Sequence, residues 1–272
     1  MRETPPSLLV FGAHPDDCEF SAAGLAALYS SIGGRVRFVS LTNGDAGHQT
    51  LGGATLARRR REEARAAAAV IGIESQVLDN HDGELLPTLD RRREIITIMR
   101  EFAPDLILVP RPNTYHPDHR YTSILVQDAA YMVTVPNVNP YASHLISDAV
   151  IMYVSDSFKK PYPFTPDVVV DIDRVAEAKV GMLHQHASQV YEWLPSNGGY
   201  SDQVPRDPAA RRDWLRGRML PTMSAIADRF REQLIATYGQ ERGQRVRYAE
   251  AFEASEYGAP FTPEARSRLF PF

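Results

Sequence analysis

The short apolar segment Leu8–Ala13 ends directly in the polar tetrapeptide His14–Asp17, which supplies one imidazole and two carboxylates. A short apolar run bounded by proline and charged residues is typical of a buried parallel strand. Much later in the chain, the apolar run Ile107–Val109 is followed by a second polar cluster, His116–His119. Because α/β proteins build their sites at the carboxyl ends of sheet strands, we expect the two clusters to meet.

The first half of the chain alternates short apolar runs with longer helical segments, and this alternation predicts an α/β fold. Glycine or proline follows each predicted helix, at Gly33-Gly34, Gly72 and Pro104. Such alternation produces a mostly parallel sheet with right-handed crossovers and helices on both faces. The predicted strands are Leu8–Ala13, Arg35–Thr42, Gln76–Leu78 and Leu106–Val109, and the predicted helices are Glu19–Ile32, Leu56–Ile71 and Leu89–Phe102.

Beyond residue 119 the pattern predicts a C-terminal α/β extension of this core. The segment Tyr191–Asp207 is rich in proline, glycine, serine and asparagine, which predicts an ordered loop or lid over the site. No repeat or clear linker is visible, so we expect one domain over residues 1–272, with a core at about 7–189 and an extension at 190–272. The predicted elements are helices over His119–Val133, Val175–Gln189 and Trp214–Tyr238 and strands over Val150–Val154, Val168–Ile172 and Tyr248–Phe252.

Composition removes several classes of function. With 43% hydrophobic residues, 24% charged residues and a net charge of −4, the chain has no general attraction to nucleic acid. The arginine runs Arg58–Arg61 and Arg91–Arg93 are expected on solvated helix faces. The single cysteine excludes an intrachain disulfide. Residues 1–6 lack a secretory signal, and no run approaches the roughly 18 apolar residues of a membrane span. We therefore expect a cytoplasmic enzyme with no membrane span.

A metal site is the simplest explanation for the two polar clusters. A catalytic zinc site needs three ligands from His, Asp or Glu and one open position. His14 and Asp17 can converge across a strand-to-helix turn, and His119 is the candidate third ligand. Asp16 then remains free as a general base, while His116 can stabilise the oxyanion or protonate the leaving group. The pattern predicts a metal-dependent hydrolase, with Zn²⁺, Fe²⁺ or Co²⁺ compatible with the ligands.

Other sites that a parallel sheet can carry lack their sequence signals here. The first strand is followed by Gly12-Ala13-His14-Pro15, without the G-x-G-x-x-G turn that binds dinucleotides. The chain also lacks a P-loop and the G-x-S-x-G elbow of a serine hydrolase. The absence of these signals favours the prediction of a metal-dependent hydrolase.

The motifs Ala13–Asp17 and His116–His119 together resemble those of the PIG-L/LmbE-like family of N-acetylglucosaminyl deacetylases. Three further segments agree, and the resemblance spans Leu8 to Gln189. These segments are Thr42–Gly47, Arg60-X-X-Glu63 and His186–Gln189.

The resemblance implies a Rossmann-like fold and a divalent metal, usually zinc, held at His14, Asp17 and His119. It also implies that Asp16 is the general base and that His116 stabilises charge or acts as the acid. Family members remove the acetyl group from N-acetylglucosamine units of small glycoconjugates, so a small amino-sugar conjugate is the expected partner. Several members are oligomeric, which makes a homo-oligomer a further expectation.

The sequence departs from the family pattern at two positions. Many members carry Glu directly after the two aspartates, whereas Cys18 precedes Glu19 here, and we expect Cys18 to be a small buried residue. Some members place an oxyanion-assisting tyrosine two positions before the first histidine of the second motif. Thr114 occupies that position, and the adjacent Tyr115 is the candidate substitute.

Several other side chains are candidates for substrate contact, each with a structural alternative. Arg60 matches the family arginine that contacts substrate, and a surface arginine is the alternative. Asp82 is a candidate sugar-binding carboxylate or a turn former. His48 is expected to be a solvated loop histidine rather than part of the mouth, and His186 either tightens a helix or borders the pocket. Trp193 can stack on a sugar face or pack in the core.

The sequence thus predicts a zinc-dependent N-deacetylase acting on an N-acetylglucosamine-type conjugate. Two alternatives stay open. One is an amidase that shares the metal site but cleaves a thiol conjugate or another N-acyl amine. The other is a non-catalytic sugar- or metal-binding protein on the same scaffold, against which the presence of both Asp16 and His116 argues.

Overall fold

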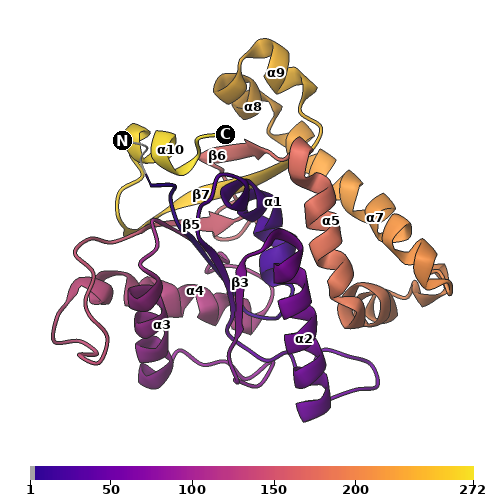
Figure 1. Ribbon diagram of the computed structural model, residues 1–272, viewed down its shortest axis with the longest axis horizontal. Helices are drawn as coiled ribbons and strands as arrows, with labels where there is room; N and C mark the ends of the chain where they lie inside the picture. Colours follow the sequence, from indigo (N-terminus) through magenta and orange to yellow (C-terminus); the bar gives the residue numbers. More distant parts are fainter. Residues whose placement is uncertain (1–3) are drawn as a thin grey trace.

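A seven-stranded sheet of order β3-β2-β1-β4-β5-β7-β6 forms the centre of the molecule, and its middle strands β1 and β4 are short and apolar (Figure 1). The computed structural model describes residues 4–272, so the first three residues of the N-terminal segment considered above lie outside it. The strands are β1 (Leu8–Gly12), β2 (Val36–Ser40), β3 (Glu74–Val77), β4 (Leu106–Val109), β5 (Val150–Val154), β6 (Val168–Asp171) and β7 (Ala249–Gly258).

The first five strands pair in parallel, and β7 runs antiparallel between β5 and β6. The predicted mostly parallel α/β fold is confirmed, and the predicted C-terminal strand is β7. Although it lies in the sequence extension, β7 is inserted into the sheet beside β5. The helices are α1 (Asp17–Ser31), α2 (Gly53–Ile71), α3 (Leu89–Phe102), α4 (Pro117–Ala130), α5 (Ala176–Gln185), α6 (Leu194–Asn197), α7 (Pro208–Arg229), α8 (Arg231–Tyr238), α9 (Gln240–Arg245) and α10 (Pro263–Leu269).

The side chains of β1 alternate between the two faces of the sheet, and each face has its own hydrophobic core. Leu8 and Val10 pack under α1 and α5, whereas Leu9 and Phe11 pack against α3 and α4 on the opposite face (Figure 1). Successive strand side chains point to opposite faces, so an apolar strand with helices on both sides is buried throughout. Strand β1 is therefore held by packing on both of its faces, and this fixes the start of the turn that follows it.

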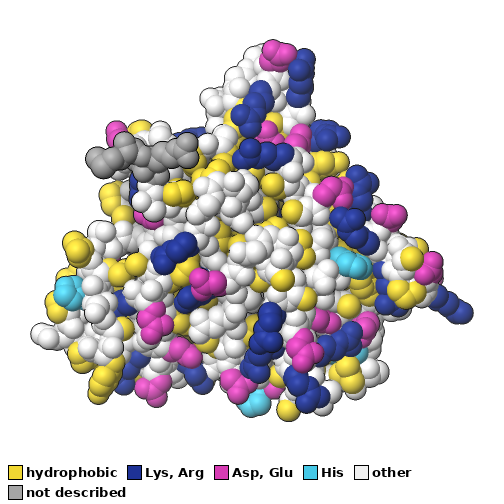
Figure 2. All heavy atoms as spheres, viewed as in Figure 1, with side chains coloured by type: hydrophobic (Ala, Val, Ile, Leu, Met, Phe, Trp, Pro, Cys, Tyr) yellow, Lys and Arg dark blue, Asp and Glu magenta, His cyan; other side chains and the backbone are white. Residues whose placement is uncertain are grey.

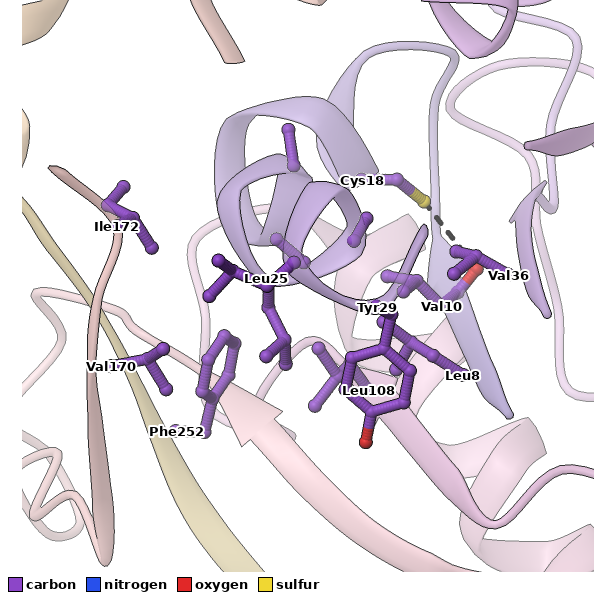
Figure 3. Packing of buried hydrophobic residues seen from close by; sticks show 14 of the residues in the cluster. Leu8, Val10, Cys18, Leu25, Tyr29, Val36, Leu108, Val170, Ile172 and Phe252 are labelled. Carbon is purple, nitrogen blue, oxygen red and sulfur yellow. Dashed lines mark hydrogen bonds between the residues drawn. The ribbon is translucent and has the colours of Figure 1, made fainter. Parts of the chain in front are cut away.

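The junction of β1 and α1 is unusually tight. Cys18, at the start of α1, is buried, and its thiol lies 3.6 Å from the carbonyl oxygen of Val10 (Figure 3). It is the small core residue that the sequence predicted, with its sulfur directed at the sheet. A Cβ added at Gly12 would lie 2.8 Å from the Cβ of Asp17, so only glycine allows this approach.

The segment Tyr191–Asp207, predicted as an ordered loop or lid, is partly helical together with the residues just before it. It forms a π-helix over Ser188–Trp193, then α6, then a 3₁₀ turn over Ser201–Gln203. Pro195 lies in the first turn of α6, where the missing N–H of proline costs no hydrogen bond. Proline in this segment is thus compatible with a helix start.

Charges on the helices are interspersed rather than segregated. Figure 2 shows basic and acidic side chains mixed over α2, α5 and α7, and Arg216 pairs with Glu177 there at 2.5 Å. Arg91–Arg93 lie on a solvated face, as predicted, but Arg60 is only 2% exposed and corrects the prediction for its run. Within residues 4–272, helices of sufficient length and apolarity to cross a membrane are absent.

Candidate metal centre and active site

The two polar clusters meet where the direction of winding changes in the sheet. Strand β1 lies between β2 and β4, so the chain leaves β1 toward one edge and returns to β4 on its other side. Crevices at such switch points, beyond the carboxyl ends of the strands, are the usual binding sites of open α/β sheets. Asp17 begins α1 after the short turn that follows β1, and His116 caps the N-terminus of α4 after β4.

His14, Asp17 and His119 bring one ligand atom each to a common point. Nδ1 of His14 lies 3.4 Å from Oδ2 of Asp17, that oxygen lies 3.2 Å from Nε2 of His119, and the two nitrogens are 3.3 Å apart. Tetrahedral ligands about 2.0–2.2 Å from zinc are separated by about 3.3–3.6 Å. The three donor atoms therefore fit a divalent metal ion by both spacing and chemical type.

The ligand atoms are oriented by the backbone and remain accessible. Oδ2 of Asp17 accepts the N–H groups of Ala13 at 2.9 Å and of His14 at 2.8 Å, which fixes the carboxylate in the turn. The side chains of His14, Asp17 and His119 are 11%, 20% and 13% exposed. Burial would raise the pKa of Asp17, but His119 and His14 hold it well below its usual range.

Asp118 supports the centre from behind, and the sequence reasoning assigned it no role. Its Oδ2 lies 3.2 Å from Nε2 of His14, the ring nitrogen that faces away from the ligand atoms. The carboxylate also accepts N–H groups from Gly83 at 2.7 Å and Leu85 at 3.2 Å, and it is fully buried. Metal-bound histidines commonly donate their second N–H to a carboxylate. Because Asp118 is adjacent in sequence to the candidate ligand His119, that rule could have predicted a supporting role for Asp118.

A second group of donor atoms, from His14, Asp82, His116 and Asp118, also lies close together. Both oxygens of Asp118 are occupied there by backbone N–H groups. Oδ1 of Asp82 lies 3.0 Å from Nε2 of His14, so the predicted sugar-binding carboxylate also contacts a ligand. Burial disfavours a charged His14, but Asp118, Asp17 and Asp82 raise its pKa well above the usual value. We conclude that this group orients His14.

Asp16 adopts a backbone conformation that non-glycine residues rarely occupy, with φ at 136°. Such strain is typical of functional positions. The carboxylate forms no capping bond to α1, and its Oδ1 lies 3.4 Å from Nη2 of Arg60. Burial raises the pKa of Asp16 to about 6, against the lowering influence of Arg60. The residue predicted as a base is thus a buried carboxylate beside the ligand Asp17.

The buried guanidinium of Arg60 is held by hydrogen bonds to main-chain carbonyls. It donates to the carbonyls of Pro15 at 2.8 Å and Gly44 at 3.2 Å, and its Nε has no partner among the described residues. A Cβ at Gly44 would approach the guanidinium to 2.5 Å, so this glycine makes room for Arg60. Arg60 therefore connects the turn that carries Asp16 with the loop that follows β2. It also lines the pocket.

His116 and Tyr115 form the opposite wall. Nδ1 of His116 accepts the N–H of Asp118 at 3.2 Å, so a neutral ring carries its proton on Nε2. Burial and the nearby His14 lower the pKa of His116, which favours that neutral form. Tyr115 is 65% exposed, and its ring packs edge-on against His116 and His119 at 5.6 and 5.1 Å.

These side chains surround a pocket of about 480 Å³. The segment 189–197 supplies its far wall through Gln189, Trp193 and Asn197, so the predicted cover lies at the site although it is helical. The predicted residues that line the pocket are His14, Asp16, Asp17, Arg60, Asp82, Tyr115 and His116. His119 reaches the ligand cluster from the other side of Asp17.

Two histidines hold this wall in place and do not line the pocket. The His48 side chain is 2% exposed and binds Glu192 at 2.8 Å, which corrects its prediction as a solvated loop residue. Arg59 also pairs with Glu192, so the β2 loop, α2 and the π-helix are joined by charge. His186 is fully buried 3.2 Å from Glu19, where it fastens the end of α5 to α1.

Comparison with known proteins agrees with this geometry. The family model PIG-L, described as GlcNAc-PI de-N-acetylase, matches residues 9–130, which contain both polar clusters. The diacetylchitobiose deacetylase of Thermococcus kodakarensis is 33% identical over 198 residues, covering 68% of this chain and 70% of the relative. The 4-oxalmesaconate hydratase of Pseudomonas putida is 25% identical over 202 residues, covering 71% and 78%.

Solved structures share the fold over most of the chain. The N,N'-diacetylchitobiose deacetylase of Pyrococcus horikoshii has a TM-score of 0.69 at 24% identity and covers 92% of this chain and 84% of its own. GalB, the 4-carboxy-2-hydroxymuconate hydratase of Pseudomonas putida, has a TM-score of 0.71 at 20% identity and covers 94% and 99%. The family match and the 33% identity over two thirds of both chains show that the protein belongs to the PIG-L family of deacetylases.

Proposed function

We propose that the protein is a metal-dependent N-deacetylase of small N-acetylglucosamine-type conjugates. The observation that carries the proposal is the meeting of Nδ1 of His14, Oδ2 of Asp17 and Nε2 of His119 within 3.2–3.4 Å, beside a pocket that also contains Asp16 and His116. This arrangement supplies three ligands, a base and a hydrogen-bond donor in one place, which amide hydrolysis requires.

A divalent metal held by His14, Asp17 and His119 would polarise the acyl carbonyl and increase the acidity of water. Asp16 is the candidate to accept the proton of the attacking water on its carboxylate, and a pKa of about 6 suits a base that works near neutral pH. The Nε2–H of His116 is available to the oxyanion. The C–N bond then breaks, the acyl group leaves as a carboxylate, and the amine takes the proton.

The lining of the pocket supports an amino-sugar substrate. Asp82, Gln189 and Asn197 present groups that hydrogen-bond hydroxyls, and Tyr115 and Trp193 offer aromatic faces at the same mouth. Several relatives are named for 2-acetamido sugars. They include the diacetylchitobiose deacetylase and a Mycobacterium 1D-myo-inositol 2-acetamido-2-deoxy-alpha-D-glucopyranoside deacetylase, which is 26% identical over 239 residues.

Hydration of an unsaturated acid is the second candidate function, because two similar proteins are hydratases. The charge of the pocket argues against it. Three carboxylates, of Asp16, Asp17 and Asp82, line the pocket together with one guanidinium, that of Arg60, which already binds two carbonyls. A polyanionic substrate would face an excess of like charge there. A neutral polyol carries no such penalty.

Acetate release from N-acetylglucosamine and N,N'-diacetylchitobiose tests the proposal, with 4-oxalmesaconate as the competing substrate. The protein is assayed as purified, after chelation, and after reconstitution with zinc, iron or cobalt, with bound metal determined by elemental analysis. We expect acetate release that chelation abolishes and one metal restores. Turnover of the unsaturated acid with no acetate release would contradict the proposal.

A further inference from the structure

A second, smaller cavity adjoins the cluster of candidate ligands and shares Asp17 with the main pocket. Its volume is about 190 Å³, and both Asp17 and His119 line it. His119 contributes to this cavity and not to the main pocket. The two spaces adjoin at Asp17 and Phe20, which line both. The metal ligands therefore stand between two cavities.

The two cavities differ in chemical character. The main pocket carries carboxylates, amides and a guanidinium, as described above. Apart from Asp17 and His119, the smaller cavity is lined mainly by residues without polar side chains, together with the two serines Ser21 and Ser155; the former are Phe11, Gly12, Phe20, Pro110 and Val154. Among these lining residues, charged side chains occur only at the ligands themselves.

An amide substrate has two substituents on opposite sides of its reacting carbonyl. The amine side of an amino sugar is polar, and the polar pocket suits it. The acyl side is an alkyl chain, and an apolar space beside the ligands is the place where such a chain leaves water most favourably. With the carbonyl at the ligand cluster, the two substituents diverge toward the two cavities.

We infer that the smaller cavity is an acyl-chain subsite and that the enzyme accepts straight-chain N-acyl groups longer than acetyl. This inference rests on the proposed function and extends it to the acyl side. A volume of about 190 Å³ equals about six water molecules at liquid density, which exceeds the need of one methyl group. The volume suits a chain of four to six carbons by the same count (roughly one carbon per water volume).

The hydrolytic step is unchanged by chain length. Water adds its oxygen to the acyl carbon, the C–N bond breaks, and the products are an alkanoate and the protonated amine. Each additional methylene that enters the cavity should tighten binding about three- to fourfold. Chain length thus reports directly on whether the cavity is used.

The test uses the metal-loaded enzyme with N-acetyl-, N-butanoyl- and N-hexanoylglucosamine. Ser155→Phe places a ring in the cavity without altering the ligands or Asp16, and Ser155→Leu is the smaller version in case the ring disturbs folding. Ser157→Phe is the matched control, because Ser157 is exposed in the same loop and does not line the cavity. Circular dichroism and thermal unfolding establish that each variant is folded.

We expect kcat/KM for the hexanoyl substrate to equal or exceed that for the acetyl substrate. Ser155→Phe should lower hexanoyl turnover at least tenfold and acetyl turnover less than twofold, and Ser157→Phe should change neither. A wild-type enzyme at least tenfold slower on hexanoyl than on acetyl would overturn the inference. So would a Ser155→Phe variant that loses both activities equally.

Calorimetry of acetate and hexanoate binding separates this inference from the proposed function. Tighter binding of hexanoate, lost in Ser155→Phe, supports the subsite even when none of the amides is hydrolysed, a result that overturns the deacetylase proposal alone. Equal binding of both acids in the wild type overturns the subsite and leaves the deacetylase proposal standing if acetate is released.

Discussion

The two ends of β1 and β4 carry acidic residues in very different settings. At the amino ends, Asp105 precedes β4 and accepts the backbone N–H of Ser7 at 2.9 Å, and its other oxygen is paired with Arg268 of α10. At the carboxyl ends, the carboxylates of Asp16, Asp17, Asp82 and Asp118 gather around three imidazoles and a single guanidinium.

This difference separates a structural carboxylate from functional ones. Asp105 accepts hydrogen bonds and pairs with an opposite charge within the protein, so its carboxylate requires no bound ion or ligand. The carboxyl-end cluster has an excess of negative charge next to a pocket, and a buried excess charge is costly unless a cation joins it. The same two strands therefore carry a stabilising contact at one end and a candidate cation site at the other.

The sharpest test of this comparison is Asp16→Asn. We expect kcat to fall about 10²–10⁴-fold, the usual contribution of general acid–base catalysis, because the amide cannot accept the proton. Acetate release at full metal occupancy measures the effect, and thermal unfolding should show a folded protein. Asp213→Asn on the exposed face of α7 is the control. Near-normal turnover in Asp16→Asn would remove this residue from the mechanism.

His119→Ala tests the ligand set. Loss of one of three ligands should weaken metal binding by more than about 100-fold, since even the supporting residues of metal sites contribute up to that factor. Elemental analysis after dialysis measures retained metal, and the exposed His144→Ala serves as control. Stoichiometric metal in His119→Ala would move the ion to the group of His14, Asp82, His116 and Asp118.

Asp118→Asn addresses the supporting carboxylate. The substitution keeps the shape but weakens the acceptor behind Nε2 of His14, and we expect a loss of about 10–100-fold in metal affinity or activity. Metal titration with a competing chelator measures it. A variant with unchanged affinity but lower thermal stability would show that Asp118 only anchors the backbone of Gly83 and Leu85.

Asp105→Asn should have the smallest effect, and only on stability. Burial would raise the pKa of Asp105, but hydrogen bonds from Ser7 and Arg268 hold it below its usual range. Its contribution is therefore present above the unfolded pKa of about 3.9 and is lost as the pH falls through the lower folded value. We expect a loss of about 1 kcal/mol at neutral pH, after allowance for partial exposure, that shrinks below about pH 4.

Denaturant titrations of wild type and Asp105→Asn at neutral pH and below pH 4 measure that difference, with acetate release as the control. Deacetylation should be unchanged. An activity loss without a stability loss would reverse the roles assigned to the two ends of the strands.

The sequence predicted the fold and the meeting of the two polar clusters because both depend on local patterns. Apolar runs such as Leu106–Val109 and terminators such as Gly72 specify strands and helix ends by short-range chemistry. The contacts of His48 and Asp118 were not predictable in this way. His48 binds Glu192, far along the chain, and Asp118 receives N–H groups from the loop after β3, so both depend on how distant segments pack.

By itself the sequence determined the mostly parallel α/β sheet, the two strand ends that carry His14–Asp17 and His116–His119, and the chemical types of the candidate ligands. The tertiary structure decided that Arg60 is buried against the turn of Asp16, that a π-helix walls the pocket, and that β7 joins the sheet. The physical reason is that strand and helix signals act over a few residues. Burial of a charge and the closing of a pocket depend on chain segments that only the completed fold brings together.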